Sequence, residues 1–164
     1  MERLAGVSIA VVLFAVFPAA QTSRAAISIT AAGSWVDTID ENDLAGGPGS
    51  DLIGAHESAA NQVSLGITGT TGGTDRWRVD VRRVDTTWHT NLHLHLRRTS
   101  NGSGPANRIS GGTSYQEITD IYRTFFSGRG DRLGIDVQLR MTGVSVAIPA
   151  ATYSSTVYYT VVDI

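Results

Sequence analysis

The chain contains no cysteine and no lysine among its 164 residues. Because there is no thiol, neither a disulfide nor a cysteine nucleophile can form. A domain of this composition must be held together by its apolar core, by a bound metal or by assembly with other chains. All 13 basic residues are arginines, which make better bidentate contacts with carboxylates than lysines do. Such contacts suit ion pairs between strands or between subunits.

Long helix-forming runs are also scarce, whereas the 18 glycines are accompanied by many serines and threonines. This composition predicts an all-β structure. The formal net charge is -2, and removal of residues 1–25 would bring it to -3, since they hold two of the 13 basic and one of the 15 acidic residues. For such a weakly acidic chain we expect neither nucleic acid nor an anionic membrane surface as the main partner.

The one long apolar run covers residues 4–17 and follows a positively charged start. It is about 14 residues long, short of the ~20 that span a bilayer. With the small residues after it, the run predicts a secretory signal peptide over residues 1–25, cleaved after Ala25 or, as a second choice, after Ala20. An uncleaved membrane anchor is the alternative. We therefore expect a secreted protein, extracellular or on the cell surface, with a single domain over residues 26–164 and no membrane span after cleavage.

Alternation of apolar and polar residues runs through much of the remaining chain and predicts strands with one dry and one wet face. Residues 114–126 fit either a helical stripe or a bent strand, and we favour the strand. The pattern predicts an antiparallel β-sandwich of seven to nine strands, immunoglobulin-like or jelly-roll-like. In its C-terminal part the dry face is assigned to Leu133, Ile135, Val137, Leu139, Met141, Val144, Val146 and Ile148.

Residues 46–53 fit one copy of the Gly-Gly-x-Gly-x-Asp-x-U repeat of calcium-binding β-rolls. A β-roll needs tandem copies, so a plain glycine-rich loop is the better interpretation. Five carboxylates nevertheless fall between Asp37 and Asp51, and Ca²⁺ takes about six to eight oxygen ligands. Asp40, Asp43 and Asp51 are therefore candidate calcium ligands, and the sequence suggests no other cofactor apart from the metal considered next.

Three histidines lie on one face of a single expected strand. His93 and His95 share a face, and His89 precedes them on the same face. Alternate residues of a strand lie about 7 Å apart, so two of these imidazoles could share a transition metal. The alternative, which we favour, is a solvent-facing polar stripe.

The spacing of serine, histidine and aspartate singles out no catalytic triad, and there is no Gly-x-Ser-x-Gly motif. The paired carboxylates Asp40 and Asp43 are not flanked by the aromatic residues that would stack on a sugar. We therefore do not expect an enzyme, and a metal-dependent enzyme using His93 and His95 is the alternative.

An alternating segment, residues 26–35, stands at the start of the expected mature chain. Such a segment can leave its own domain and add to the open sheet edge of a neighbour, where its apolar side chains fill pockets. It can also pair within its own sheet, and both arrangements stay open at this point. Near the C-terminus, one of two consecutive tyrosines must face outward and is a candidate interface contact. The candidate assembly residues are thus Ile27, Ile29, Trp35, Tyr158 and Tyr159.

The residues Pro149-Ala150-Ala151-Thr152-Tyr153, followed by Val157-Tyr158-Tyr159-Thr160-Val161, resemble the final strand of secreted pilin-like β-sandwiches. These include the spore coat protein U group and the subunits of chaperone–usher fimbriae, which often end in a Pro-Ala-Gly-x-Tyr turn and an alternating strand. Ala151 stands here in place of the glycine, and the disulfide common in such subunits is absent. The resemblance implies an incomplete immunoglobulin-like fold that is completed by a strand from a neighbour.

The sequence therefore predicts a secreted structural subunit of an extracellular filament or surface layer. It would form a homo-oligomer or homopolymer by strand complementation or edge pairing. The alternative is a monomeric extracellular module that binds carbohydrate or another ligand, with calcium in the loop of residues 37–51.

Overall fold

The structure is a computed structural model that describes residues 7–13 and 26–164. Within these residues the regular structure consists of 12 strands and two short 3₁₀ turns, Glu41–Asp43 and Ala106–Arg108. The strands are β1 (Val7–Leu13), β2 (Ser28–Ala32), β3 (Trp35–Ile39), β4 (Ala55–Glu57), β5 (Val63–Thr68), β6 (Arg76–Thr87), β7 (His93–Arg98), β8 (Ile109–Gly111), β9 (Gln116–Glu117), β10 (Arg123–Arg129), β11 (Arg132–Thr142) and β12 (Tyr153–Asp163).

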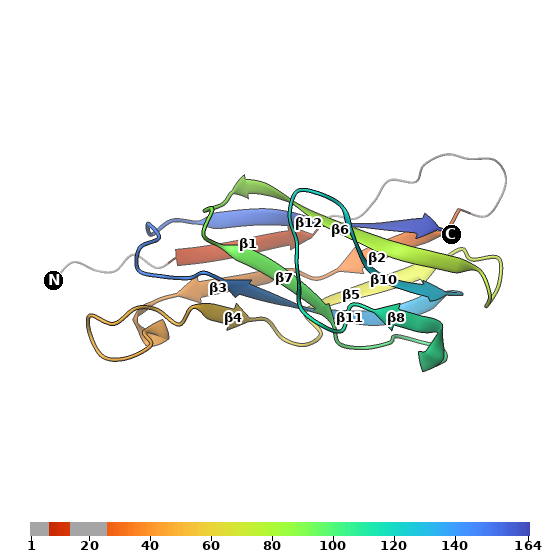
Figure 1. The fold of residues 1–164 in the computed structure, drawn as a ribbon, viewed down its shortest axis with the longest axis horizontal. Helices are drawn as coiled ribbons and strands as arrows, with labels where there is room; N and C mark the ends of the chain where they lie inside the picture. Colours follow the sequence, from red (N-terminus) through yellow and green to blue (C-terminus); the bar gives the residue numbers. More distant parts are fainter. Residues whose placement is uncertain (1–6, 14–25) are drawn as a thin grey trace.

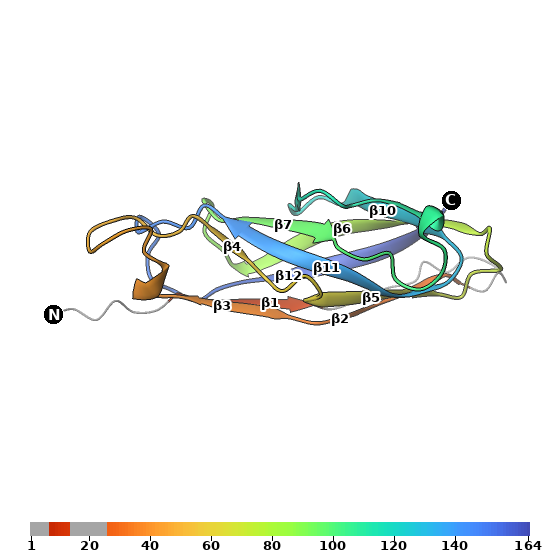
Figure 2. The ribbon, with the colours of Figure 1, turned by 90° about the horizontal axis from the view of Figure 1, so that it is seen from below.

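The strands form two six-stranded sheets that share one apolar core. Sheet A has the order β3-β1-β12-β6-β10-β8, and sheet B has the order β2-β5-β11-β7-β9 with β4 paired to β11 beyond the end of β5. Neighbouring strands are antiparallel, except that β1 runs parallel to β12. In Figure 1 and Figure 2 the strands run roughly along the long axis of the molecule. The prediction of an all-β sandwich is confirmed.

The number of strands exceeds the seven to nine that we expected. Strands β4, β8 and β9 are pairings of only two or three residues, which are too short to show alternation in the sequence. Strand β1 lies inside the expected signal peptide. Residues 114–126 contain β9 and the start of β10 and no helix, so the choice of strand over helix was right.

Strand β11 supplies much of the core, with Ile135, Val137, Leu139 and Met141 fully buried as alternation predicts. The pattern fails at the start of the strand, where Arg132 is 1% exposed and Leu133 is 58% exposed. The pairing of β11 with β5 shifts register between residues 132 and 135, and this bulge turns the two side chains the opposite way from the prediction.

The alternation assigned beyond β11 also ends earlier than predicted. Strand β11 stops at Thr142, and a turn follows in which the Ile148 amide donates to the Ser145 carbonyl at 3.0 Å. Val144 is still buried, but Val146 is 62% exposed. The dry face assigned to Val146 is therefore wrong, because the chain no longer forms a strand there.

Residues 1–6 and 14–25, which include both expected cleavage sites, lie outside the described residues. In the part of the chain that is described, no helix is long and apolar enough to cross a membrane.

The chain changes sheets between β2 and β3 at Gly33. This residue has φ +129°, and a Cβ there would lie 2.2 Å from the carbonyl oxygen of Gln62. Only glycine combines that backbone angle with so close an approach. Gly33 therefore lets one N-terminal segment place β2 in sheet B and β3 in sheet A.

Replacing Gly33 with alanine should lower the free energy of unfolding by about 2 kcal/mol, since the new Cβ meets backbone in a strained conformation. Thermal denaturation followed by circular dichroism measures the change. Gly47→Ala is the matched control, because nothing lies within 4 Å of a Cβ at Gly47. An unchanged melting temperature for Gly33→Ala would contradict the described crossover.

Candidate functional site

The feature of sheet A that bears most on function is the place between β3 and β12, which we name the β1 position. Residues 7–13 hold this place in the described chain, and Figure 1 shows the red β1 between the orange β3 and the blue β12. The register with β12 runs from Ile9 opposite Tyr153 to Leu13 opposite Val157. Among the described residues, β3 pairs with no strand other than β1, so residues 7–13 connect β3 to the rest of the sheet.

The strands on either side of the β1 position present apolar side chains to the core. Tyr153 and Val157 on β12 are buried, as are Trp35 and Ile39 on β3. Because directly opposed residues share a face of the sheet, every second residue of a strand held here lies over the core. A strand that fits the β1 position should therefore carry apolar residues at every second place.

Strand β3 has further attachments that do not depend on β1. His56 on β4 places its Nδ1 3.0 Å from an Asp37 carboxylate oxygen, and its Nε2 lies 2.9 Å from the Ile53 carbonyl oxygen. The Gly33 crossover ties the start of β3 to β2. These contacts hold one wall of the β1 position against sheet B.

An empty β1 position would leave the facing edges of β3 and β12 without partners. Each ladder spans five residue pairs. A buried main-chain group without a partner costs about 1–3 kcal/mol, and an exposed one is a template for pairing with another strand. The geometry therefore favours a strand in this place.

The candidate assembly residues of the N-terminal segment are placed in their own chain. Strand β2 pairs with β5 from Ser28 to Ala32, which is the intramolecular arrangement left open above. Ile29 and Trp35 are 3% and 6% exposed, and Ile27 packs against the same core. In a single chain these side chains therefore serve their own core, and their addition to a neighbour's sheet stays a prediction.

The two tyrosines on β12 have different environments. Tyr159 is buried, which raises the pKa of its hydroxyl above the ordinary value, so it is not an interface residue. Tyr158 is the outward one and is half-buried beside Arg82, whose guanidinium also lies 4.8 Å from the ring centroid of Tyr122. Tyr158 alone of the pair keeps its place as a candidate contact.

The three candidate calcium ligands have separate structural roles. Asp40 caps a 3₁₀ turn by accepting from the Asn42 amide at 2.8 Å, and Asp43 accepts from the Asp40 amide at 2.9 Å. Asp51 accepts from the amide of Val146 at 2.9 Å, and this bond is the largest cause of its lowered pKa. Within residues 7–13 and 26–164, no three histidine or carboxylate side chains gather closely enough to hold a metal. Each carboxylate thus has a local structural role, and calcium binding by this loop stays a prediction.

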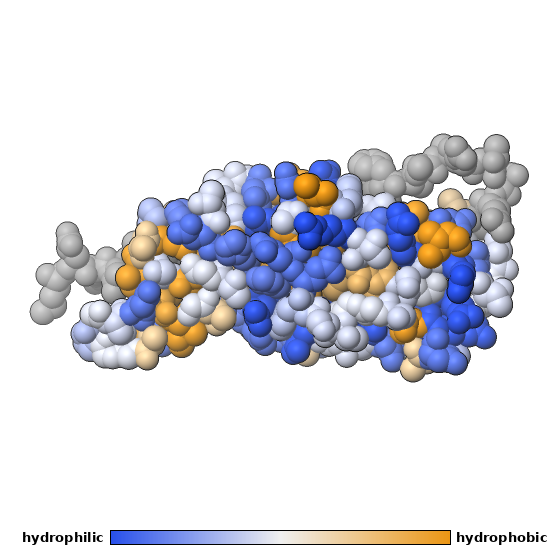
Figure 3. All heavy atoms as spheres, in the orientation of Figure 1, coloured by the Kyte–Doolittle hydropathy of each residue, from blue (hydrophilic) through white to orange (hydrophobic). Residues whose placement is uncertain are grey.

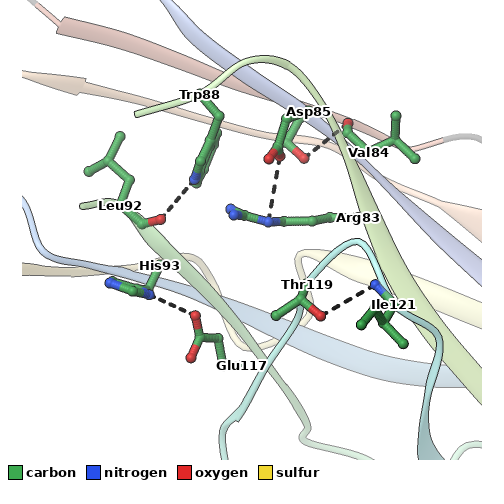
Figure 4. A network of polar contacts seen from close by, with 10 residues as sticks. Arg83, Val84, Asp85, Trp88, Leu92, His93, Glu117, Thr119 and Ile121 are labelled. Carbon is green, nitrogen blue, oxygen red and sulfur yellow. Dashed lines mark hydrogen bonds and ion pairs between the residues drawn. The ribbon is translucent and has the colours of Figure 1, made fainter. Parts of the chain in front are cut away.

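The two histidines of β7 also have separate partners. His93 Nδ1 lies 2.7 Å from a carboxylate oxygen of Glu117, as Figure 4 shows, and His95 Nε2 lies 3.1 Å from the Thr142 hydroxyl. The hydrogen bond with His93 is the main cause of a lowered pKa for Glu117, whereas burial lowers the pKa of His95. Each imidazole thus has its own partner in the structure, and the shared transition metal stays a prediction.

Glu117 was not a candidate in the sequence, because the pairing that brings it to His95 belongs to β9, a strand of two residues. No local pattern signals so short a strand. The predicted strand around the histidines also begins later than expected, at His93, so His89 lies in the preceding turn.

A polar and aromatic cluster closes the end of the sandwich where the chain passes from sheet A to sheet B (Figure 4). The Arg83 guanidinium lies 4.7 Å from the ring centroid of Trp88, and its Nε lies 3.5 Å from Asp85. The Trp88 indole donates to the Leu92 carbonyl at 2.7 Å, and the Arg83 amide donates to the Thr119 carbonyl at 2.8 Å. The cluster fastens two connections between the sheets.

Apolar surface is dispersed on the face seen in Figure 3, where apolar side chains form small groups among hydrophilic ones. The most exposed large apolar residues come from different elements. They are Val36, Ile121, Leu133, Val146 and Ile164. The β1 position is therefore the candidate site in the described part of the chain.

No family model matches this chain, and no curated protein matches it.

Proposed function

We propose that the chain is a secreted structural subunit of an extracellular filament or surface layer, joined to its neighbours by strand complementation at the β1 position. The observation that carries the proposal is the place of β1 in sheet A. The strand that connects β3 to β12 belongs to residues 1–25, the segment expected to be removed as a signal peptide. After that removal, the fold lacks one central strand.

A strand from another chain can restore what is lost. Addition of a strand supplies main-chain hydrogen bonds on both sides and apolar side chains over the core. The absence of cysteine supports this route, because assembly then contributes stability that disulfides cannot supply.

The register defines the chemistry of the donated strand. Its positions opposite Tyr153, Ser155 and Val157 face the core, because those three residues are buried. Its positions opposite Ser154 and Thr156 lie on the outer face. The donor should therefore carry apolar residues at alternate places and small or polar residues between them.

The exported chain tests the proposal. N-terminal sequencing identifies the mature start, and size exclusion with light scattering, followed by negative-stain images, shows the assembly state. We expect polymers of uniform width. A synthetic peptide with the sequence of residues 7–13, extended by lysines for solubility, should bind the depolymerised subunit, prevent reassembly and raise its melting temperature.

At a peptide concentration about 100 times the dissociation constant, this stabilisation amounts to about 2.7 kcal/mol. The control is the same peptide with proline at the place of Val11, which cannot donate to the ladder there. A mature chain that stays monomeric and does not bind the peptide would refute strand complementation at the β1 position.

A further inference from the structure

In the uncleaved chain the β1 position is closed by the chain itself. Residues 7–13 pair on both sides, and Val11 lies opposite both Ser155 of β12 and Trp35 of β3. The two ladders together cover the edges that a donated strand would use. Before cleavage, a neighbour therefore finds no free main-chain edge at this position.

Covalent connection favours this internal strand over any competitor. Strand β1 belongs to the same chain as β3 and β12, so its pairing with them is intramolecular. A segment on a short tether competes at an effective concentration on the order of millimolar. A strand from another chain in dilute solution cannot match that concentration.

We infer that residues 7–13 act as an intramolecular plug that keeps the uncleaved chain from assembling, an inference that rests on the proposed function. The plug completes sheet A and pairs with the edges of β3 and β12 that face it. Removal of residues 1–25 takes the whole plug away and opens the position for a neighbour. The segment that directs export thus also sets when assembly begins.

The full-length chain, made without export and refolded from denaturant, tests the inference. Val11→Pro is the informative variant, because proline removes a main-chain donor in the middle of a central strand. Leu4→Pro, outside the seven residues of β1, is the matched control. Light scattering and negative-stain images give the assembly state, and circular dichroism gives the β content.

We expect the unaltered chain and the Leu4→Pro variant to be monomeric. The Val11→Pro variant should polymerise, and excess peptide with the sequence of residues 7–13 should return it to monomers. Polymerisation of the unaltered full-length chain to the same extent as the variant would overturn the inference, while leaving strand complementation in place.

Two further results would also overturn it. The first is a folded, monomeric Val11→Pro chain when the exported chain polymerises. The second is an unfolded Val11→Pro chain that the peptide does not restore, because residues 7–13 would then be an obligatory part of the fold. If the exported chain is itself monomeric and does not bind the peptide, the proposed function is refuted.

Discussion

Replacing Trp77 with alanine is expected to lower the free energy of unfolding by about 3–5 kcal/mol. The Trp77 side chain on β6 is fully buried, and its indole donates to the Gly130 carbonyl at 2.9 Å. Its ring meets Phe126 edge-on, with centroids 6.1 Å apart. Truncation therefore removes a large apolar contact, leaves a cavity and orphans a buried carbonyl.

Urea denaturation of the Trp77→Ala chain, followed by circular dichroism, gives the change. Val84→Ala on the same strand is the control and should cost less than about 1 kcal/mol, because Val84 is 39% exposed. The space around Trp77 is shaped by Gly128, where a Cβ would lie 2.4 Å from an indole carbon. A loss for Trp77→Ala no larger than the control would show that the two sheets do not pack around this ring.

Replacing Arg132 with leucine is expected to lower the free energy of unfolding by on the order of 3 kcal/mol. It should also loosen the connection of residues 99–108 between β7 and β8. The guanidinium is buried and donates to the carbonyls of Asn101 and Ser103, both at 2.8 Å, and to that of Pro105. Leucine would fill part of the volume but leave these acceptors without their donor. The effect should appear in the global stability and in the local order of the loop.

Two measurements separate these effects, namely the unfolding free energy and the rate of cleavage in the loop by a broad-specificity protease. Arg123→Leu is the matched control, because Arg123 is exposed on β10, the strand that precedes β11 in the chain. Arg132→Lys should recover little, since an ammonium group lacks the planar fork that reaches several carbonyls at once. Unchanged protease resistance of Arg132→Leu would refute the role assigned to this side chain.

Alternation in the sequence was sufficient to predict the core strands. It located most of the buried face of β11 because the two-residue period repeats several times along that strand. It failed at Arg132 and Leu133, since a bulge depends on the register with β5 and not on local residue types. Arg132 looked like a surface residue because carbonyl partners carry no sequence signal.

The candidate site could be predicted only in part. The apolar run of residues 4–17 fits a signal peptide, and a short apolar run also fits a buried strand, so its pattern alone does not distinguish the two. Its pairing with β3 and β12 joins distant parts of the chain. The Asp40, Asp43 and Asp51 carboxylates were close in sequence, but each was already engaged by nearby backbone amides.

The orientation of the strands has a mechanical consequence. Strands β3 and β12 run roughly along the long axis of the molecule, as Figure 1 shows, and a strand held between them shares that direction. Tension along that axis would pull such a strand parallel to its own length. All the hydrogen bonds of both ladders would then bear the load together in shear, whereas a pull across the sheet would break them one after another. A junction of this kind resists stretching far better than peeling.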